Sequence, residues 1–210
     1  MYRPAVAPIE PITVERLAEP GEALFFEGDP CDYVYELRRG IARGVSLSAD
    51  GERQISAFFF AGDQIGLPVA EAYRFTAEAV TQLCYVCHSR ARWHEALVRS
   101  WREEGRLLPS ICAEQDPIFR RGIIIGRNGL LIRICAFLHC IVDRLPRDGE
   151  AFVLPLTQSD IGAYLATTPE SVCRGFRQLR EMGVIAMPSR ERLQVLDRPR
   201  LEAIASGAQN

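Results

Sequence analysis

The residues of this sequence best placed to do chemistry lie in TTPESVCRGFRQL, residues 167–179, where one carboxylate and several guanidinium groups recur at helical spacing. At about 100° per residue, Glu170, Arg174 and Arg177 share one face of a helix. A carboxylate accepts a hydrogen bond from cytosine N4, and a guanidinium donates two to guanine O6 and N7, so this face can read base pairs. The alternative is a solvated ion pair between Glu170 and Arg174, which would contribute about 0.3 to 0.5 kcal/mol.

The segments around this face follow a pattern typical of DNA-binding units. LTQSDIGAYL at 156–165 predicts a short helix with Thr157 as its N-cap and Asp160 in a variant of the capping box. After the turn ATT, Thr168 caps a second helix and Pro169 takes its first position, where a missing N–H costs nothing. These segments predict a helix-turn-helix. The next segment, GVIAMPSRERLQVLD, predicts two strands joined by a turn, which makes the unit winged.

The predicted contact surface combines base-reading and phosphate-binding side chains. We expect its DNA contacts at Thr168, Glu170, Ser171, Cys173, Arg174, Arg177, Arg190 and Arg192. Arginines around the helix and the wing would set the register on DNA through phosphate contacts. Two acidic residues, Glu181 and Glu191, dilute the positive charge, so we do not expect tight non-specific binding.

Cys173 is a candidate redox switch within this surface. A position near a helix N-terminus and beside Arg174 and Arg177 favours the thiolate, which is the form that oxidises. Oxidation to sulfenic or sulfinic acid would add bulk and, once ionised, a negative charge against the DNA phosphates. The alternative is that Cys173 serves only as a small, weak hydrogen-bond donor.

Residues 118–145, IFRRGIIIGRNGLLIRICAFLHCIVDRL, predict one long helix after an interruption near Pro109 and Pro117. Its apolar residues form two stripes, one through Leu130, Ile134, Phe137 and Ile141, the other through Ile124, Leu131, Leu138 and Leu145. A helix that is apolar on two sides is buried on two sides, and one side can face a second copy of the chain. The predicted dimer interface comprises Ile123, Leu130, Ile134, Phe137 and Ile141. The alternative is a helix within the core of a monomer.

The N-terminal part of the chain has a different pattern. Residues 14–87 contain short apolar runs such as EALFFEG, broken by Gly, Asp and Pro, which predict an antiparallel barrel or jelly roll. The predicted fold class is therefore α+β, with an antiparallel β-roll, a long dimerisation helix and a winged helix-turn-helix. The predicted domains are residues 1–112, 113–146 and 147–210.

Composition narrows the possible classes of protein. A chain of 210 residues that is 48% hydrophobic suits one or two compact domains. No apolar run approaches the roughly 18 residues of a membrane span, and the N-terminus lacks a signal-peptide pattern, so we expect a cytoplasmic protein without a membrane partner. Seven cysteines without framework spacing indicate reduced thiols. The sequence has no lysine, and arginine has a planar fork that suits phosphates and guanine.

The order of β-roll, long helix and winged helix-turn-helix, with LTQSDIGAYLATTPESVCRGFRQLREMGVI at 156–185, resembles the Crp/Fnr family of bacterial transcription regulators over nearly the whole chain. AYRFTAEAV at 72–80 and IGRNGLLIRICAFL at 125–138 are most similar to the FixK branch, which acts in low-oxygen gene control. The resemblance implies a homodimer on a palindrome such as TTGAT-N4-ATCAA, with RNA polymerase as a partner. It also implies that Glu170 and Arg174 read bases, whereas Cys173 replaces a serine common in the family.

The signal-binding motifs of this family are largely missing. Its cyclic-nucleotide binders pair a GE turn with an R-S/T-A motif that holds the phosphate. The corresponding segment here, GDQIGLPVAEAYRFTA at 62–77, has Pro68 near the turn and Phe75 within the second motif. The iron–sulfur branch has several N-terminal cysteines, and here none precedes Cys31. We therefore expect no cofactor.

CYVCH at 84–88 is the stretch that favours another class, a haem- or redox-active sensor in which the thiols carry the chemistry. Its letters match a c-type haem attachment pattern. In a strand, however, Cys84 and Cys87 would point to opposite faces about 10 Å apart, too far to bridge or to hold one ion. No Ser/His/Asp set, phosphate loop or metal-binding helix motif indicates an enzyme. We expect a DNA-binding regulator.

Overall fold

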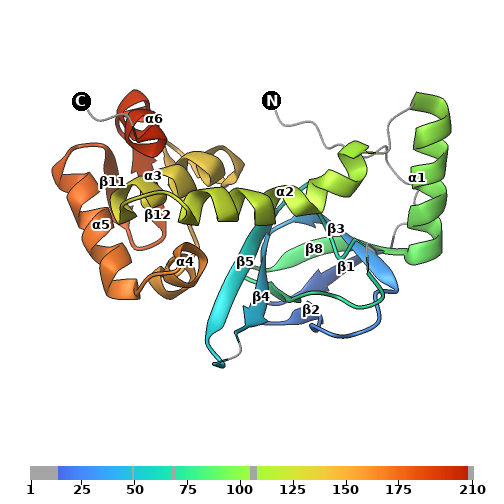
Figure 1. Cartoon of the computed structure of the whole chain (residues 1–210). Coiled ribbons are helices and arrows are strands. Elements are labelled where there is room, and N and C mark those ends of the chain that lie inside the picture. The colour runs from blue at the N-terminus through green and yellow to red at the C-terminus, as the bar shows by residue number, and fades with distance from the viewer. Residues whose placement is uncertain (1–13, 49, 68–69, 105–107, 208–210) are drawn as a thin grey trace. The chain divides into compact units, whose positions relative to one another are not determined.

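The computed structural model describes residues 14–48, 50–67, 70–104 and 108–207 (Figure 1). An antiparallel β unit is followed by a helical unit with a small sheet, so the predicted α+β class is confirmed. The chain divides into two compact units, residues 1–119 and 120–210, and the boundary lies inside helix α2 (Leu108–Ile125). Within the described residues, no helix is both long enough and apolar enough to cross a membrane.

The first unit is the predicted β-roll, built from two four-stranded antiparallel sheets. In spatial order, one sheet contains β1 (Glu15–Ala18), β8 (Leu83–Ser89), β3 (Tyr33–Arg39) and β6 (Gln64–Ile65). The other contains β2 (Ala23–Phe25), β7 (Thr76–Ala79), β4 (Ile41–Leu47) and β5 (Arg53–Phe60). Helix α1 (Arg90–Glu104) follows β8 directly.

Aromatic rings fill the space between these two sheets. Phe25 and Tyr73 stack with their ring centroids 3.7 Å apart, and the centroids of Phe59 and Phe75 are 5.7 Å apart. Tyr35, from the opposite sheet, lies 5.3 Å from Phe25 between ring centroids, and burial raises the pKa of its hydroxyl. Because each buried ring removes roughly 150 to 250 Å² from water, these rings dominate the stability of the roll.

The prediction of one helix over residues 118–145 is wrong, because the chain forms two helices there. Helix α2 ends at Ile125, and α3 (Leu130–Ile141) begins after a short turn. Gly129 precedes α3 with a φ of +101°, which lies outside the right-handed helical region and is accessible to glycine. The predicted interruption is confirmed near Pro109, because α1 ends at Glu104 and α2 begins at Leu108. It is wrong for Pro117, which lies inside α2.

Three residues of the predicted dimer interface are buried inside the second unit. Ile134 and Phe137 are 0% exposed and Ile141 is 6% exposed, so they cannot contact a partner chain. The ring of Phe137 packs against Tyr164, with centroids 5.1 Å apart. A Cβ on Gly175 would overlap the side chain of Ile134. This part of the prediction is wrong because the core of the same chain covers the stripe.

The second stripe is covered in the same way. Ile124, Leu138 and Leu145 are buried, and Leu130 of the first stripe is half-buried. Burial on two sides is thus confirmed, but both sides face the chain's own residues, as in the monomer-core alternative. Residues 113–146 therefore form no separate unit. Of the predicted interface residues, Ile123 on α2 keeps a largely exposed side chain, at 49%.

The second unit consists of helices around a small antiparallel sheet. Besides α3, these are η1 (Val142–Arg144), α4 (Gln158–Leu165), α5 (Pro169–Glu181) and α6 (Arg198–Ser206). The sheet order is β11 (Ile185–Ser189), β12 (Arg192–Val195), β10 (Ala151–Val153) and β9 (Arg147–Asp148). Because the hairpin of β11 and β12 directly follows α5, the predicted wing is confirmed.

Candidate nucleic-acid interface

Helix α4 is the first helix of the helix-turn-helix, and it begins at the predicted cap. The hydroxyl oxygen of Thr157 accepts a hydrogen bond from the backbone N–H of Asp160 at 3.0 Å, and the carboxylate of Asp160 accepts one from the N–H of Thr157 at 3.4 Å. Ile161 and Leu165 are buried, as predicted. The helix ends at Ala166, whose left-handed φ of 52° turns the chain toward α5.

Helix α5, the predicted recognition helix, is fixed at its start and along its inner face. Thr168 is the N-cap, and its hydroxyl oxygen accepts a hydrogen bond from the N–H of Ser171 at 3.3 Å. Pro169 lies in the first turn. The side chains predicted to face the core are all buried, namely Val172, Phe176 and Leu179. Packing of this face leaves the opposite face in solvent.

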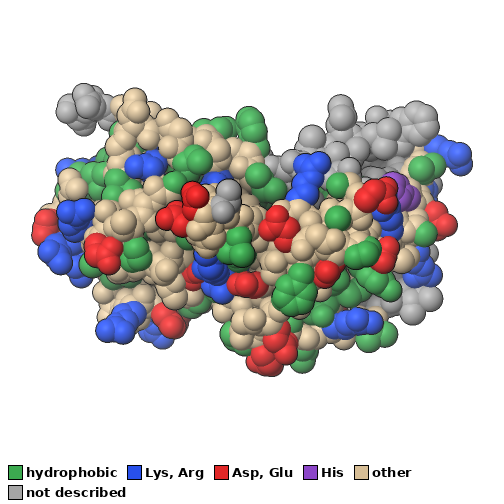
Figure 2. Space-filling model, turned by 60° about the horizontal axis from the view of Figure 1, so that its bottom comes forward, with side chains coloured by type: hydrophobic (Ala, Val, Ile, Leu, Met, Phe, Trp, Pro, Cys, Tyr) green, Lys and Arg blue, Asp and Glu red, His purple; other side chains and the backbone are tan. Residues whose placement is uncertain are grey.

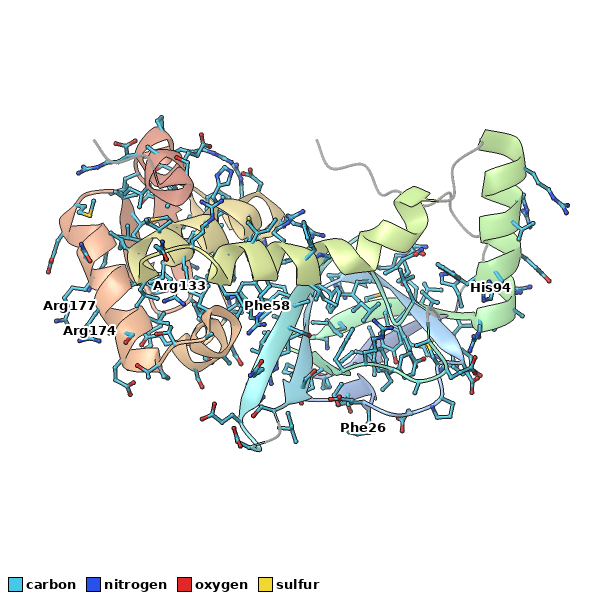
Figure 3. The ribbon with its side chains drawn as sticks, viewed as in Figure 1. Phe26, Phe58, His94, Arg133, Arg174 and Arg177 are labelled. Atoms are coloured by element: carbon cyan, nitrogen blue, oxygen red, sulfur yellow. The ribbon has the colours of Figure 1, made fainter. Side chains whose placement is uncertain are left out.

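The outer face of α5 carries the side chains predicted to read bases. Glu170, Arg174 and Arg177 are exposed, and Figure 3 shows Arg174 and Arg177 projecting outward from the helix. Arg174 Nη2 donates a hydrogen bond to Ser171 Oγ at 3.0 Å, and Ser171 Oγ lies 3.1 Å from Thr168 Oγ1. No ion pair joins Glu170 to Arg174, although the structure describes both. The ion-pair alternative is therefore absent, and both charges face solvent.

The wing places its two predicted phosphate-binding arginines in different environments. Arg190 lies in the exposed turn between β11 and β12. Arg192 instead forms an ion pair with Asp148 of β9. Arg190 is therefore the better placed of the two for a phosphate, because Arg192 is already partnered within its own sheet.

A groove of about 640 Å³ runs between the start of α4, the side of α5 and the wing. Cys173 and Phe176 line it from α5, Arg180 and Arg190 add positive charge, and Glu191 adds one negative charge. Cys173 is half-buried, so its thiol faces this groove and lies off the exposed face that carries Glu170. The spacing along the sequence predicted that Cys173 lies near the DNA, but it did not reveal this groove in the protein.

Charges on the surface of the second unit are mixed. Arginine and acidic side chains lie among one another on the face shown in Figure 2. Arg198 Nη1 lies 2.9 Å from Asp143 Oδ1, and this hydrogen bond lowers the pKa of Asp143. Glu181 and Glu191 are exposed beside α5 and the wing. An excess of positive charge is therefore local to the outer face of α5, whereas Arg190 and Glu191 offset one another in the turn of the wing.

The thiols of CYVCH are separated by the strand, as predicted. On β8, Cys87 packs with Leu83 and Tyr85 against the core of the roll, whereas Cys84 alternates to the other face. Burial raises the pKa of the Cys87 thiol, and it raises that of Cys135 in α3 to about 12. Among the described residues, no three His, Cys, Asp or Glu side chains are placed to hold a metal ion.

The fold and the exposed face of α5 define a DNA-binding transcription regulator rather than an enzyme. Residues 132–204 match the family model of a Crp-like helix-turn-helix domain, and residues 15–100 match that of a cyclic nucleotide-binding domain. The chain is 32% identical to the transcriptional activatory protein AadR of Rhodopseudomonas palustris, over 91% of this chain and 83% of that protein. It belongs to the Crp/Fnr family of transcription regulators.

The similarity to FixK proteins covers almost the full length. The chain is 27% identical to the nitrogen fixation regulation protein FixK of Rhizobium meliloti, over 98% of this chain and 100% of that protein. The solved structure of FixK2 from Bradyrhizobium japonicum matches with a TM-score of 0.84 and 27% identity, covering 94% of this chain and 99% of that one. The predicted resemblance to the family and to its FixK members is confirmed.

In the roll, the segment that departs from the cyclic-nucleotide motif lines a hollow of about 220 Å³. Tyr73 and Phe75 line it, and a Cβ on Gly44 would lie 3.0 Å from the ring of Phe75. Arg74 also lines the hollow but is exposed. Pro68, the other predicted departure from the binding motif, lies outside the described residues.

Sequence reasoning missed two sets of residues on helices α2 and α3. Phe119 is 69% exposed and lies one helical turn before Ile123, so α2 has an exposed apolar pair. The spacing of four residues between Phe119 and Ile123 was a signal in the sequence from which this pair could have been predicted. Arg121 and Arg133 donate hydrogen bonds to backbone carbonyls of α4. Such contacts have no sequence signature, because every residue carries a carbonyl.

Proposed function

We propose that this chain acts as a homodimer that reads a palindrome resembling TTGAT-N4-ATCAA in low-oxygen or redox-linked gene control. The observation that supports this most is the outer face of α5, where Arg174 is held by Ser171 and faces solvent. The names of the relatives AadR and FixK, a transcriptional activatory protein and a regulator of nitrogen fixation, support a role in gene control.

Glu170 and Arg174 supply the base readout in this proposal. Each half-site TTGAT contains one G·C pair, and Arg174 donates to its guanine while Glu170 accepts from a cytosine N4. An arginine has five N–H donors, so Arg174 keeps its bond to Ser171 while it contacts the base. The Thr168–Ser171–Arg174 series of hydrogen bonds therefore orients the guanidinium before DNA arrives.

Phosphate contacts come from residues around this face. Arg177 on α5 and Arg190 in the wing are exposed, and Thr168 and Ser171 add hydroxyls at the start of α5. In the groove beside the wing, where the DNA backbone would pass, Arg180 and Arg190 outnumber the single acidic residue Glu191. Arg192 contributes less, because Asp148 already neutralises it.

The two chains meet along the exposed face of α2. Phe119 and Ile123 lie one turn apart on this helix and are 69% and 49% exposed. Gly122 between them is also exposed, so a partner helix can approach closely. Such a dimer would set the two α5 helices about 34 Å apart, to match half-sites one turn of DNA apart. RNA polymerase is the further partner that the family suggests.

Oxidation of Cys173 would regulate this readout. Its thiol lines the groove that carries Arg180 and Arg190, so an ionised sulfinate there would pair with these arginines and repel a phosphate. The alternative, a passive contact by the thiol, predicts no response to oxidants.

Fluorescence anisotropy with labelled duplexes tests the proposed operator. The probes are the palindrome, a palindrome with the G·C pair of each half-site changed to A·T, and a scrambled duplex at the same salt concentration. Because one wrong base pair costs about 1 to 3 kcal/mol, we expect a loss of more than tenfold for the doubly changed duplex. Equal binding to all three would overturn the proposed operator and leave only non-specific DNA binding.

A further inference from the structure

The C-terminal end of α4 is held by groups from outside the helix-turn-helix. The last four carbonyls of a helix have no partner within it. In α4, the carbonyl of Gly162 accepts hydrogen bonds from the N–H groups of Ala166 and Thr167 in the following turn. The next three carbonyls, of residues 163–165, accept hydrogen bonds from arginine side chains.

These donors are Arg121 of α2 and Arg133 of α3. Arg121 Nε donates to the carbonyl of Tyr164 at 2.8 Å, and its Nη2 to that of Ala163 at 3.4 Å. Arg133 Nη1 donates to the carbonyl of Leu165 at 3.0 Å. Every remaining carbonyl at this helix end is thus bound by a guanidinium, whose charge also suits the negative end of the helix dipole.

No carboxylate among the described residues compensates the charge of these two arginines. Among the described residues, neither Arg121 nor Arg133 forms an ion pair with Asp or Glu. Burial lowers the pKa of Arg121, and the Nε of Arg133 is buried without a hydrogen-bond partner. Burying a cation is costly unless it is compensated, and here the helix-end carbonyls compensate it. The guanidinium of Arg121 also lies 5.9 Å from the centroid of the Tyr164 ring. Arg133 is half-buried, in contrast to Arg174, which is exposed and projects outward from α5 in Figure 3.

The turn that follows these carbonyls leaves the chain little freedom. Ala166 has a left-handed φ of 52°, which costs a residue with a Cβ some backbone strain. A Cβ on Gly162 would lie 2.8 Å from the carbonyl oxygen of Thr167, so α4 and the start of α5 are nearly in contact. The direction in which α4 ends therefore decides the direction in which α5 begins.

Arg121 also lies on the helix that carries the exposed apolar pair. Two residues along a helix correspond to about 200°, so Arg121 faces away from both Phe119 and Ile123. Its side chain is half-buried, whereas theirs are largely exposed. One face of α2 thus holds α4, and the opposite face is the one we assign to the dimer.

We propose that Arg121 and Arg133 are positioning residues for DNA reading, which hold the end of α4 and thereby orient α5. Through Arg121, the same contact ties the orientation of α5 to the helix that joins the two chains. This inference rests on the proposed readout by α5. It adds a role for two residues that touch no DNA.

The chain offers a matched control in Arg127. Arg127 Nη1 donates to the carbonyl of Ala205 in the last turn of α6, and its Nε is buried without a partner, like that of Arg133. The chemistry is therefore the same, but α6 carries none of the residues proposed to contact DNA. Replacing each arginine with methionine removes the donors and keeps an unbranched apolar side chain.

The test compares Arg121→Met, Arg133→Met and Arg127→Met in the full chain, at a temperature where circular dichroism shows each to be folded. Hydrogen exchange by mass spectrometry reports on the turn after α4 and on α6. Anisotropy gives the affinity for the palindrome and for the scrambled duplex. We expect faster exchange in the turn for Arg121→Met and Arg133→Met, with the palindrome-to-scrambled ratio reduced about tenfold, equivalent to one charge-assisted hydrogen bond. Arg127→Met should speed exchange in α6 and keep the parent ratio.

A conservative variant and two contrary results complete the test. Arg133 uses a single nitrogen, so Arg133→Lys should recover most of the ratio that Arg133→Met loses. An unchanged ratio in Arg121→Met and Arg133→Met, or an equal fall in Arg127→Met, would overturn the positioning role. A parent without preference for the palindrome would instead overturn the proposed operator, and the exchange data would still decide whether these arginines hold the turn.

Discussion

Replacing Arg174 with alanine removes the proposed guanine contact and little else. Arg174 is exposed and its one described hydrogen bond, to Ser171, is on the surface, so the free energy of unfolding should change by less than about 0.5 kcal/mol. A bidentate contact to guanine contributes about 1 to 3 kcal/mol of discrimination. A symmetric dimer loses two such contacts, so binding to the palindrome should weaken by about 2 to 6 kcal/mol, or at least about 30-fold.

The assay for Arg174→Ala is anisotropy on the palindrome, on the duplex with altered G·C pairs, and on the scrambled duplex. The variant should bind the first two almost equally, because it no longer distinguishes the guanine. Arg190→Ala is the control, since a lost phosphate contact should weaken all three duplexes alike and reduce the salt slope by about one per chain. Equal losses on all three duplexes for Arg174→Ala would show that this side chain contacts phosphate, and the readout proposed for α5 would be wrong.

Three further variants test the dimer, the thiol and the packing of α5. Phe119→Glu combined with Ile123→Glu should give a monomer by light scattering at micromolar concentration, and a parent that is monomeric even with DNA would refute the dimer. Cys173→Ser should bind like the reduced parent and resist mild peroxide that releases the parent, whereas parallel losses would assign the sensitivity elsewhere. Gly175→Ala should lower the free energy of unfolding in urea by about 1 to 3 kcal/mol, because its Cβ would overlap Ile134. Adding Ile134→Val should restore part of that loss, and an unchanged urea midpoint for Gly175→Ala would contradict this close packing.

Local chemistry made the helix-turn-helix predictable. The caps at Thr157 and Thr168, the proline at the start of α5 and the buried face of α5 each depend on residues within a few positions of one another. Such signals are present in the sequence because the hydrogen bonds that they describe are local. The exposed positions of Glu170 and Arg174 followed from the same helical period.

Long-range packing was not predictable in the same way. The hydrophobic periodicity indicated that two sides of α3 are buried. It does not indicate whether the same chain or a second chain buries them, and Ile134 and Phe137 are core residues of the same chain. The break before α3 had a signal in Gly129, which the long apolar pattern outweighed. The contacts of Arg121 and Arg133 depend on where α4 ends in space, which no spacing along the chain reveals.

Arginine is the only strongly basic side chain of this protein, both at its helix ends and on its proposed DNA-facing surface. A guanidinium keeps its proton throughout the physiological pH range, and the chain has no lysine ammonium that acetylation could neutralise. Neither a change of pH nor an acetyltransferase acting on side chains can therefore weaken DNA binding by removing these positive charges. A switch that works through charge has to add a negative one nearby, as oxidation of Cys173 in its arginine-lined groove would do.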